Sequence, residues 1–364
     1  MNESVLREKL NNPTYHLLSI PGCLFTQDCK IIKINHDIYE ITLYPGFPLT
    51  SGQRNIVRDE LLKYLQFSDK LQEYSIKIYP IVVARKSQNA IKPISGIKNI
   101  VAIASGKGGV GKSTVTSNLA ISLANAGAKV GILDADIYGP SQPTIMNGKY
   151  NPTTKDKIKI EPILSHGVRF ISIGNLISQD AAVIWRGPVV SKALTQLIQD
   201  TNWGQLDYLL IDLPPGTGDI HLTVLKSIAI TAAILVTTPQ SLSLADVRRT
   251  ITMLKKLNIY ICGMIENMAF HCCKECGSIS HIFGKDEVKE LYSKLNIFPL
   301  AKIPLDIQIQ EDADKGLPSS ARSDNNKIKD LYQEIALSCS SRMSTTPKLS
   351  LLNSIGVKVM TNRN

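Results

Sequence analysis

Short apolar runs alternate with helical segments through most of the chain. From residue 99 onward six of these runs are predicted to be strands: Ile100–Ala104, Val130–Asp134, Val168–Ile173, Tyr208–Ile211, Ala232–Thr237 and Tyr260–Glu266. Near-continuous apolar strands separated by helices are typical of a parallel sheet that is buried on both faces. We therefore predict an α/β domain over residues 91–339, with a mostly parallel sheet covered by helices on both faces.

A different pattern precedes this domain, and it predicts a small α+β domain over residues 1–90. Lys30–Ile34 and Ile38–Tyr44 are expected to pair as a hairpin, and the apolar spacing of Arg54–Leu65 predicts a helix. Tyr74–Val83 is predicted to be a third strand, and Pro80 within it favours an edge position.

Two further segments are expected to be irregular. Residues 86–97 are polar and contain proline and glycine, which is typical of a linker. Residues 340–364 carry basic but no acidic side chains, and we expect a flexible basic tail there.

Composition and charge limit the possible partners. The chain has 364 residues, with 43% hydrophobic and 20% charged residues, which are ordinary values for a globular protein. Its net charge of +10 is diffuse, with no run of five or six basic residues, so we expect no nucleic-acid partner. No apolar run approaches the roughly 18 residues of a membrane span, and the N-terminus does not resemble a signal peptide. A cytoplasmic protein without a membrane partner is therefore expected.

A phosphate-binding loop follows the first strand of the α/β domain. Residues 105–114 read S-G-K-G-G-V-G-K-S-T, which satisfies G-x-x-x-x-G-K-[ST] between a strand and a helix. Backbone N–H groups of such a loop bind phosphate oxygens, while Lys112 would reach the β- and γ-phosphates and Ser113 would bind Mg²⁺. We expect ATP and Mg²⁺ to bind here, through Gly106, Lys107, Gly108, Gly109, Val110, Gly111, Lys112, Ser113 and Thr114.

A second candidate for the magnesium site is Asp212. It ends the strand Y-L-L-I and opens the run D-L-P-P-G-T-G-D. An aspartate at the carboxyl end of a buried strand is placed where it can reach a metal ion bound beside the phosphates.

Three of the seven cysteines lie together, as Cys272, Cys273 and Cys276. A C-x-x-C pair can ligate zinc or an iron–sulfur cluster, and redox dithiols share the spacing. One alternative is an intrachain zinc site made by His271 with the three cysteines. Another is a symmetric homodimer, in which two pairs supply the four thiolates of a bridging [4Fe–4S] cluster.

The motifs together resemble a known family. G-K-G-G-V-G-K-S resembles the deviant phosphate loop of the MinD/ParA/nitrogenase-iron-protein class. The runs L-D-A-D-I-Y-G-P-S, W-R-G-P, W-G-Q-L-D-Y and D-L-P-P-G-T-G-D are similar to those of the Mrp/ApbC iron–sulfur carriers, over roughly residues 95 to 335.

This resemblance implies roles for individual residues. Lys107 would cross a dimer interface to the partner's nucleotide, Asp136 would orient the attacking water, and Asp134 would lie near Mg²⁺. Asn267 would hydrogen-bond the adenine and Pro304 would line the base pocket. Cys273 and Cys276 would ligate the cluster, and Cys272 is expected not to.

The resemblance also implies a function with partners. The chain would be a homodimeric ATPase that takes a [4Fe–4S] cluster from a donor and passes it to client apoproteins. Two alternatives share the phosphate loop: a positioning ATPase of the MinD/ParA type, and a zinc-stabilised P-loop ATPase without cluster transfer.

Overall fold

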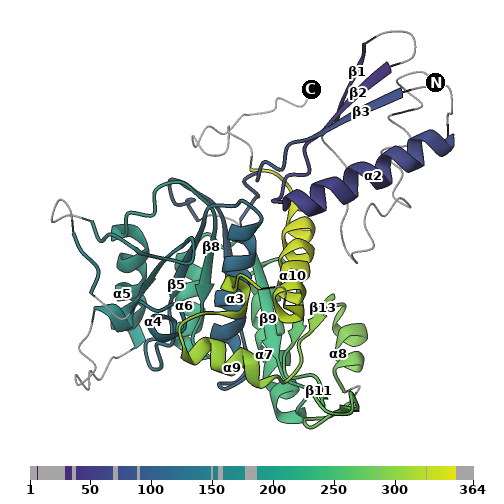
Figure 1. The fold of residues 1–364 in the computed structure, drawn as a ribbon. Helices are drawn as coiled ribbons and strands as arrows, with labels where there is room; N and C mark the ends of the chain where they lie inside the picture. The colour runs from purple at the N-terminus through teal and green to yellow at the C-terminus, as the bar shows by residue number, and fades with distance from the viewer. Residues whose placement is uncertain are drawn as a thin grey trace, which may run out of the picture.

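The computed structural model describes residues 6, 29–34, 38–68, 73–87, 91–148, 151–154, 159–176, 187–285, 287–324 and 326–349. The chain forms a small N-terminal unit and a larger α/β domain, joined near one end of the long C-terminal helix (Figure 1). The N-terminal sheet lies away from the central sheet, so the two sheets have separate cores.

An eight-stranded sheet forms the centre of the α/β domain. Its order is β13-β10-β9-β4-β8-β5-β7-β6, and every neighbouring pair is parallel except β6 and β7. All six predicted strands are confirmed, as β4 (Ile97–Ala104), β5 (Val130–Asp134), β7 (Val168–Ser172), β8 (Leu206–Asp212), β9 (Ala232–Thr237) and β10 (Ile261–Glu266).

The sequence reading missed both edge strands of this sheet. They are β6 (Ile163–Ser165) and β13 (Pro299–Lys302), which are short and partly exposed. Because an edge strand has one open side, it lacks the continuous apolar run by which a central strand is recognised.

Helices cover both faces of the central sheet, as predicted. On one face, α3 (Lys112–Asn125) and α10 (Lys327–Ser344) pack together over a shared apolar core. The opposite face is covered by α5 (Gly187–Asp200), α6 (Asp219–Ser227), α7 (Ser241–Lys256) and α8 (Glu287–Leu295). The short helices α4 (Gln142–Ile145) and α9 (Ile307–Asp314) lie in contact near the carboxyl ends of the strands.

The N-terminal unit is a three-stranded sheet with one long helix. The strands β1 (Cys29–Lys33) and β2 (Ile38–Leu43) form the predicted antiparallel hairpin, whose turn at residues 35–37 lies outside the described residues. The helix α2 (Ser51–Ser68) packs on the sheet. As predicted, β3 (Glu73–Ile78) is an edge strand, but it ends two residues before Pro80.

The described part of the expected tail is ordered, which corrects the prediction for residues 340–349. Helix α10 continues to Ser344 because Ser340, Ser341 and Met343 are buried. The chain then pairs with the segment that joins the two units: Leu349 N donates to Ala84 O at 3.0 Å. Residues 350–364 lie outside the described residues.

Among the described side chains, Leu337 and Arg85 join the two units. Leu337 of α10 is buried in the apolar core of the N-terminal unit. Arg85 is also buried, and its Nη1 donates to Thr346 O at 3.0 Å while its backbone N–H donates to Asn99 Oδ1 at 3.0 Å. The N-terminal unit is therefore anchored to α10 and to the start of the central sheet.

None of the helices that the structure describes is long and apolar enough to cross a membrane.

Candidate functional site

The phosphate-binding loop connects β4 to α3 at the carboxyl edge of the sheet. Gly109 and Gly111 have φ values of 77° and 80°, in the left-handed region that favours glycine. Gly106 packs directly against the backbone of α7, where a Cβ atom would lie less than 3.0 Å from Asp246 and Val247. Close packing therefore requires glycine at position 106 of the motif, and the left-handed backbone favours glycine at positions 109 and 111.

Lys112 and Asp212 form a buried ion pair at the start of α3. The Lys112 ammonium contacts Asp212 Oδ1, and the two side chains are 6% and 0% exposed. Thr116 Oγ1 donates to the same oxygen at 3.3 Å. Two of the sequence-predicted residues are thus brought into direct contact, although 100 positions separate them in the chain.

Gln142 is a site residue that the sequence reading missed. It begins α4 and is fully buried. Its Nε2 donates to Asp212 Oδ2 at 2.9 Å and to Ser113 O at 3.1 Å, and its Oε1 accepts from Ser117 Oγ at 2.8 Å. The side chain therefore connects the segment after β5 to the phosphate loop. Only its place directly after the D-A-D-I-Y-G-P-S run could have suggested this role.

Asp134 lies at the end of β5 beside Asp212, which ends β8. It accepts hydrogen bonds from Ser172 Oγ at 2.9 Å, Gln142 N at 3.2 Å and Asp136 N at 3.1 Å. Burial raises the pKa of Asp134 to about 7, and the neighbouring Asp212 carboxylate acts in the same direction. Two buried carboxylates with one neighbouring lysine carry excess negative charge when both are ionised, and this arrangement suits a divalent cation.

Asp136 and Lys107 are more accessible than this buried cluster. Asp136 is partly buried, which raises its pKa, while the positive charge of Lys112 acts in the opposite direction. Lys107 is exposed at the tip of the phosphate loop, and no described carboxylate forms an ion pair with it.

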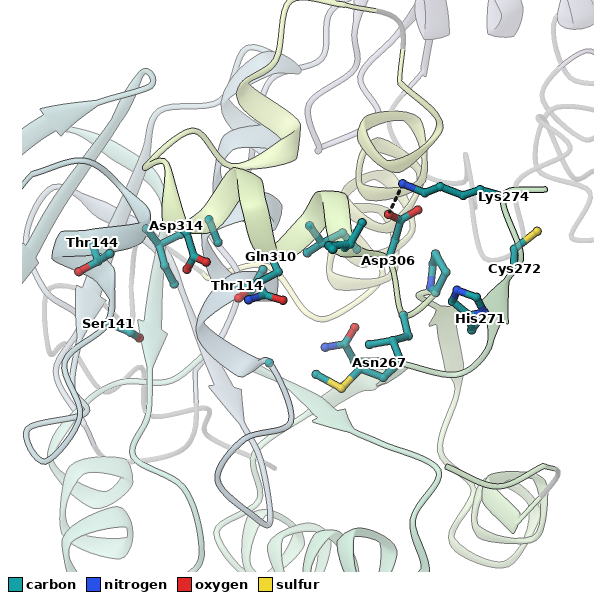
Figure 2. A pocket seen from close by; sticks show the side chains of 18 of the residues that line it. Thr114, Ser141, Thr144, Asn267, His271, Cys272, Lys274, Asp306, Gln310 and Asp314 are labelled. Carbon is teal, nitrogen blue, oxygen red and sulfur yellow. Dashed lines mark ion pairs between the residues drawn. The ribbon is translucent and has the colours of Figure 1, made fainter. Parts of the chain in front are cut away.

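One cavity of about 1130 Å³ extends from the phosphate loop to the cysteine segment. Figure 2 shows Thr114 and Asn267 lining the same space as His271 and Cys272. Pro304 lines it as well. This volume slightly exceeds the roughly 300–1,000 Å³ of common small-molecule sites. The cavity thus brings the predicted base-pocket residues together with the start of the cysteine segment.

Asn267 contacts the phosphate loop directly. Its Nδ2 donates to Val110 O at 2.8 Å, and its side chain also lies against Gly111, where a Cβ atom would displace the Asn267 amide. The residue is 6% exposed, follows β10 and precedes Met268, whose φ of 54° turns the chain toward the cysteines. Asn267 therefore links the phosphate loop to the segment that carries Cys273.

The cysteine segment is a tight hairpin between β11 (His271–Cys272) and β12 (Ile279–Ser280). Cys273 and Cys276 occupy its turn, which is closed by Gly277 N donating to Cys273 O at 2.9 Å. Hydrogen bonding from Ser278 lowers the pKa of the Cys276 thiol to about 7, and Cys273 contributes in the same direction. Two adjacent thiols, one of them readily ionised, are suited to binding a soft metal centre.

Cys272 lies in β11, directly before the turn that carries this pair. Its side chain points away from Asn267 and outward from the cavity (Figure 2). Its Sγ lies 3.6 Å from Gly277 O. Within the described ranges, no three His, Cys, Asp or Glu side chains converge where they could hold a metal ion. The intrachain zinc alternative, which needs His271 and all three cysteines at one centre, is therefore not supported by this arrangement.

Trp185 and Arg186, from the W-R-G-P run, lie outside the described residues. His221 in α6 is described and buried, and the sequence reading did not single it out.

Comparisons with known proteins agree with these features. Residues 96–339 match the family described as ParA: NUBPL iron-transfer P-loop NTPase. The chain is 43% identical over 311 residues to the iron-sulfur cluster carrier protein of Haemophilus influenzae, covering 84% of this chain and 83% of that protein. It is 47% identical over 244 residues to the carrier of the same description from Escherichia coli K12, covering 67% and 66% of the two chains.

A solved structure shares the fold. It is a nucleotide-binding protein from Archaeoglobus fulgidus in complex with ADP, with 39% identity and a TM-score of 0.54. The match covers 61% of this chain and 87% of that one.

Proposed function

Because the chain belongs to the family of ParA-type NUBPL iron-transfer P-loop NTPases, we propose that it is an ATP-hydrolysing iron–sulfur cluster carrier. Two copies would hold one [4Fe–4S] cluster between them and pass it to apoproteins. The cluster is cargo, received from a donor protein, while ATP and Mg²⁺ are bound at the phosphate loop. A positioning ATPase would share this loop, but the relatives described above are carriers.

The phosphate loop fits a nucleoside triphosphate. Gly109 and Gly111 let the loop curl, and the N-terminus of α3 presents its N–H groups to the same point. Lys112 would contact the β- and γ-phosphates, while Ser113 and Asp212 would hold Mg²⁺. The excess negative charge at Asp134 and Asp212 supports a cation there.

Hydrolysis would use residues at the outer edge of this site. Asp136, which is partly buried next to the loop, would orient the attacking water. Lys107 is exposed at the loop tip, from which it could reach a second protomer and neutralise charge on the transferred phosphoryl group. Magnesium would supply further neutralisation of that charge when bound.

The cluster would be held by Cys273 and Cys276 from each protomer. One hairpin offers two thiols at its exposed turn, and a four-iron cluster takes four. A second copy related by two-fold symmetry provides the other pair. Cys272, which points away, would stay free.

The observation that carries the proposal is the shared cavity. Its lining includes Gly111 and Thr114 at one end and Cys272 and Cys273 at the other, with Asn267 between them. The nucleotide would therefore bind against the base of the hairpin that holds the cargo. This proximity gives ATP a physical route to alter cluster exposure.

Anaerobic reconstitution tests the proposal. The wild type should gain a visible thiolate-to-iron absorbance band, with about four irons and four sulfides per dimer. Cys273→Ser and Cys276→Ser should each lose the cluster, because each change removes two of the four thiolates. Cys272→Ser is the matched control and should retain it.

Transfer is measured by activating an apo-enzyme that needs a [4Fe–4S] cluster, with and without ATP. Four irons on a monomer would contradict the bridging arrangement, and zinc without sulfide would contradict cluster carriage. Loss of the cluster in Cys272→Ser would require a different ligand set.

A further inference from the structure

A buried histidine lies behind the nucleotide site without a hydrogen-bond partner. His221 is the third residue of α6, and it is 1% exposed. Neither Nδ1 nor Nε2 has a hydrogen-bond partner among the residues that the structure describes. Because burying polar atoms without partners is unfavourable, such a group calls for an explanation.

The surroundings of His221 keep its ring neutral. Burial lowers the pKa of His221 to about 4, and the positive charge of Lys112 acts in the same direction, while the Gly216 backbone opposes both. The ring also lies in the first turn of α6, where the helix dipole disfavours a cation. A neutral imidazole carries one N–H donor and one acceptor nitrogen. The ring thus retains a donor, and the Gly216 backbone lies close enough to raise the pKa of His221 by a weak hydrogen-bonding interaction, although neither ring nitrogen reaches full hydrogen-bond geometry in this arrangement.

The segment next to His221 has room to move. Residues 213–218 connect Asp212 at the end of β8 to the start of α6. Gly216 has a φ of 92°, and a Cβ added there or at Gly218 would meet nothing within 4 Å. Gly216 N donates to Ser105 O at 3.1 Å, so this segment is already in contact with the phosphate loop.

We propose that His221 is a positioning residue for segment 213–218: when this segment closes over the terminal phosphate, the imidazole donates a hydrogen bond to the Gly216 carbonyl. That bond holds the segment, and Asp212 at its start, in the arrangement that hydrolyses ATP. The ring is too deeply buried to touch the attacking water, so it acts through the segment. This inference rests on the ATP hydrolysis proposed above.

Steady-state kinetics of the full-length protein separate this role from a packing role. His221→Leu should lower kcat for ATP at least fivefold and leave KM within twofold, because the bond forms after the nucleotide binds. The melting temperature of the nucleotide-free protein should not fall, since carbon atoms replace polar atoms that lack partners. His221→Asn and His221→Gln place an amide donor near Nδ1 and Nε2 respectively, and one of them should recover at least half of kcat.

Ser227→Ala is the matched control, because Ser227 ends the same helix and its described hydrogen bonds, to Val224 O at 3.0 Å and from Thr195 Oγ1 at 3.3 Å, involve neither segment 213–218 nor the phosphate loop. It should leave kcat unchanged. The inference is overturned if His221→Leu keeps kcat within twofold, if kcat and melting temperature fall together, or if neither amide variant recovers activity.

Hydrogen exchange provides a readout that does not depend on turnover. A non-hydrolysable ATP analogue should slow amide exchange in residues 213–218 of the wild type, and His221→Leu should remove at least half of that protection. If the wild type shows this protection but no hydrolysis, the proposed ATPase activity fails and the positioning role stands. If the analogue gives no protection in the wild type, the positioning role is overturned.

Discussion

Replacing Gly111 with alanine should destabilise the α/β domain by about 2–5 kcal/mol. The first contribution is the left-handed backbone at φ 80°, which costs an L-residue roughly 1–2 kcal/mol. The second arises because the new Cβ would overlap Asn267 Nδ2 and displace the amide from Val110 O. Leaving buried polar groups without partners costs roughly 1–3 kcal/mol.

Gly127→Ala is the control for the backbone contribution alone. Gly127 follows the end of α3 with a φ of 94°, and its Cβ would meet nothing within 4 Å. This variant should therefore lose only about 1–2 kcal/mol. The difference between the two variants isolates the contact between Gly111 and Asn267.

The free energy of unfolding can be measured in urea by the fluorescence of the two tryptophans, Trp185 and Trp203, whose positions both fall within residues 96–339 that match the family. A double-mutant cycle with Asn267→Ala sharpens the test, because removing the amide removes the overlap. The double variant should then be more stable than the sum of the single losses predicts. The reasoning is refuted if Gly111→Ala is no less stable than Gly127→Ala, or if the cycle is additive.

Two further predictions concern the charges of the site. Lys112→Ala should abolish ATP binding in calorimetry and lower the free energy of unfolding by about 3–5 kcal/mol, since it leaves Asp212 buried without its ion-pair partner. Lys107→Ala should keep the free energies of ATP binding and of unfolding within about 0.5 kcal/mol of the wild type while suppressing hydrolysis. Equal loss of ATP affinity in both variants would argue against a trans-acting lysine. The pKa of Asp134 is raised in the folded state, so between about pH 4 and 7 the folded protein holds a proton that the unfolded chain releases. The free energy of unfolding should therefore be highest below about pH 4, as far as this group is concerned, and should fall as the pH rises toward 7. In urea titrations the free energy of unfolding of the wild type should fall by about a few kcal/mol between pH 4 and 7, and the fall should be smaller in Asp134→Asn. A free energy of unfolding that rises over this pH range would contradict the raised pKa of Asp134.

The sequence by itself determined the central architecture. Strands β4, β5, β8, β9 and β10 were predictable because a strand buried on both faces must be apolar along its length, and this signal is local. The phosphate loop was equally visible, because its glycines are required by a backbone shape that few other residues adopt. The C-x-x-C pair was visible from its spacing, and comparison with relatives supports the family that the motifs suggested.

Only the tertiary structure decided which residues meet at the site. Gln142 contacts Asp212 across 70 positions, and no local pattern specifies such a contact. The same holds for Arg85, whose bond to Thr346 O spans 261 positions and orders a segment that composition alone suggested was loose.

The burial of His221 was also hidden from the sequence, because a histidine in an amphipathic helix is compatible with either an exposed or a buried face. Likewise, the spacing of the cysteines predicts a ligand pair but not the cavity that joins them to the phosphate loop. Contacts of this kind arise because the parallel strands β10, β9 and β4 end at the same edge of the sheet, and that proximity exists only when the sheet is assembled.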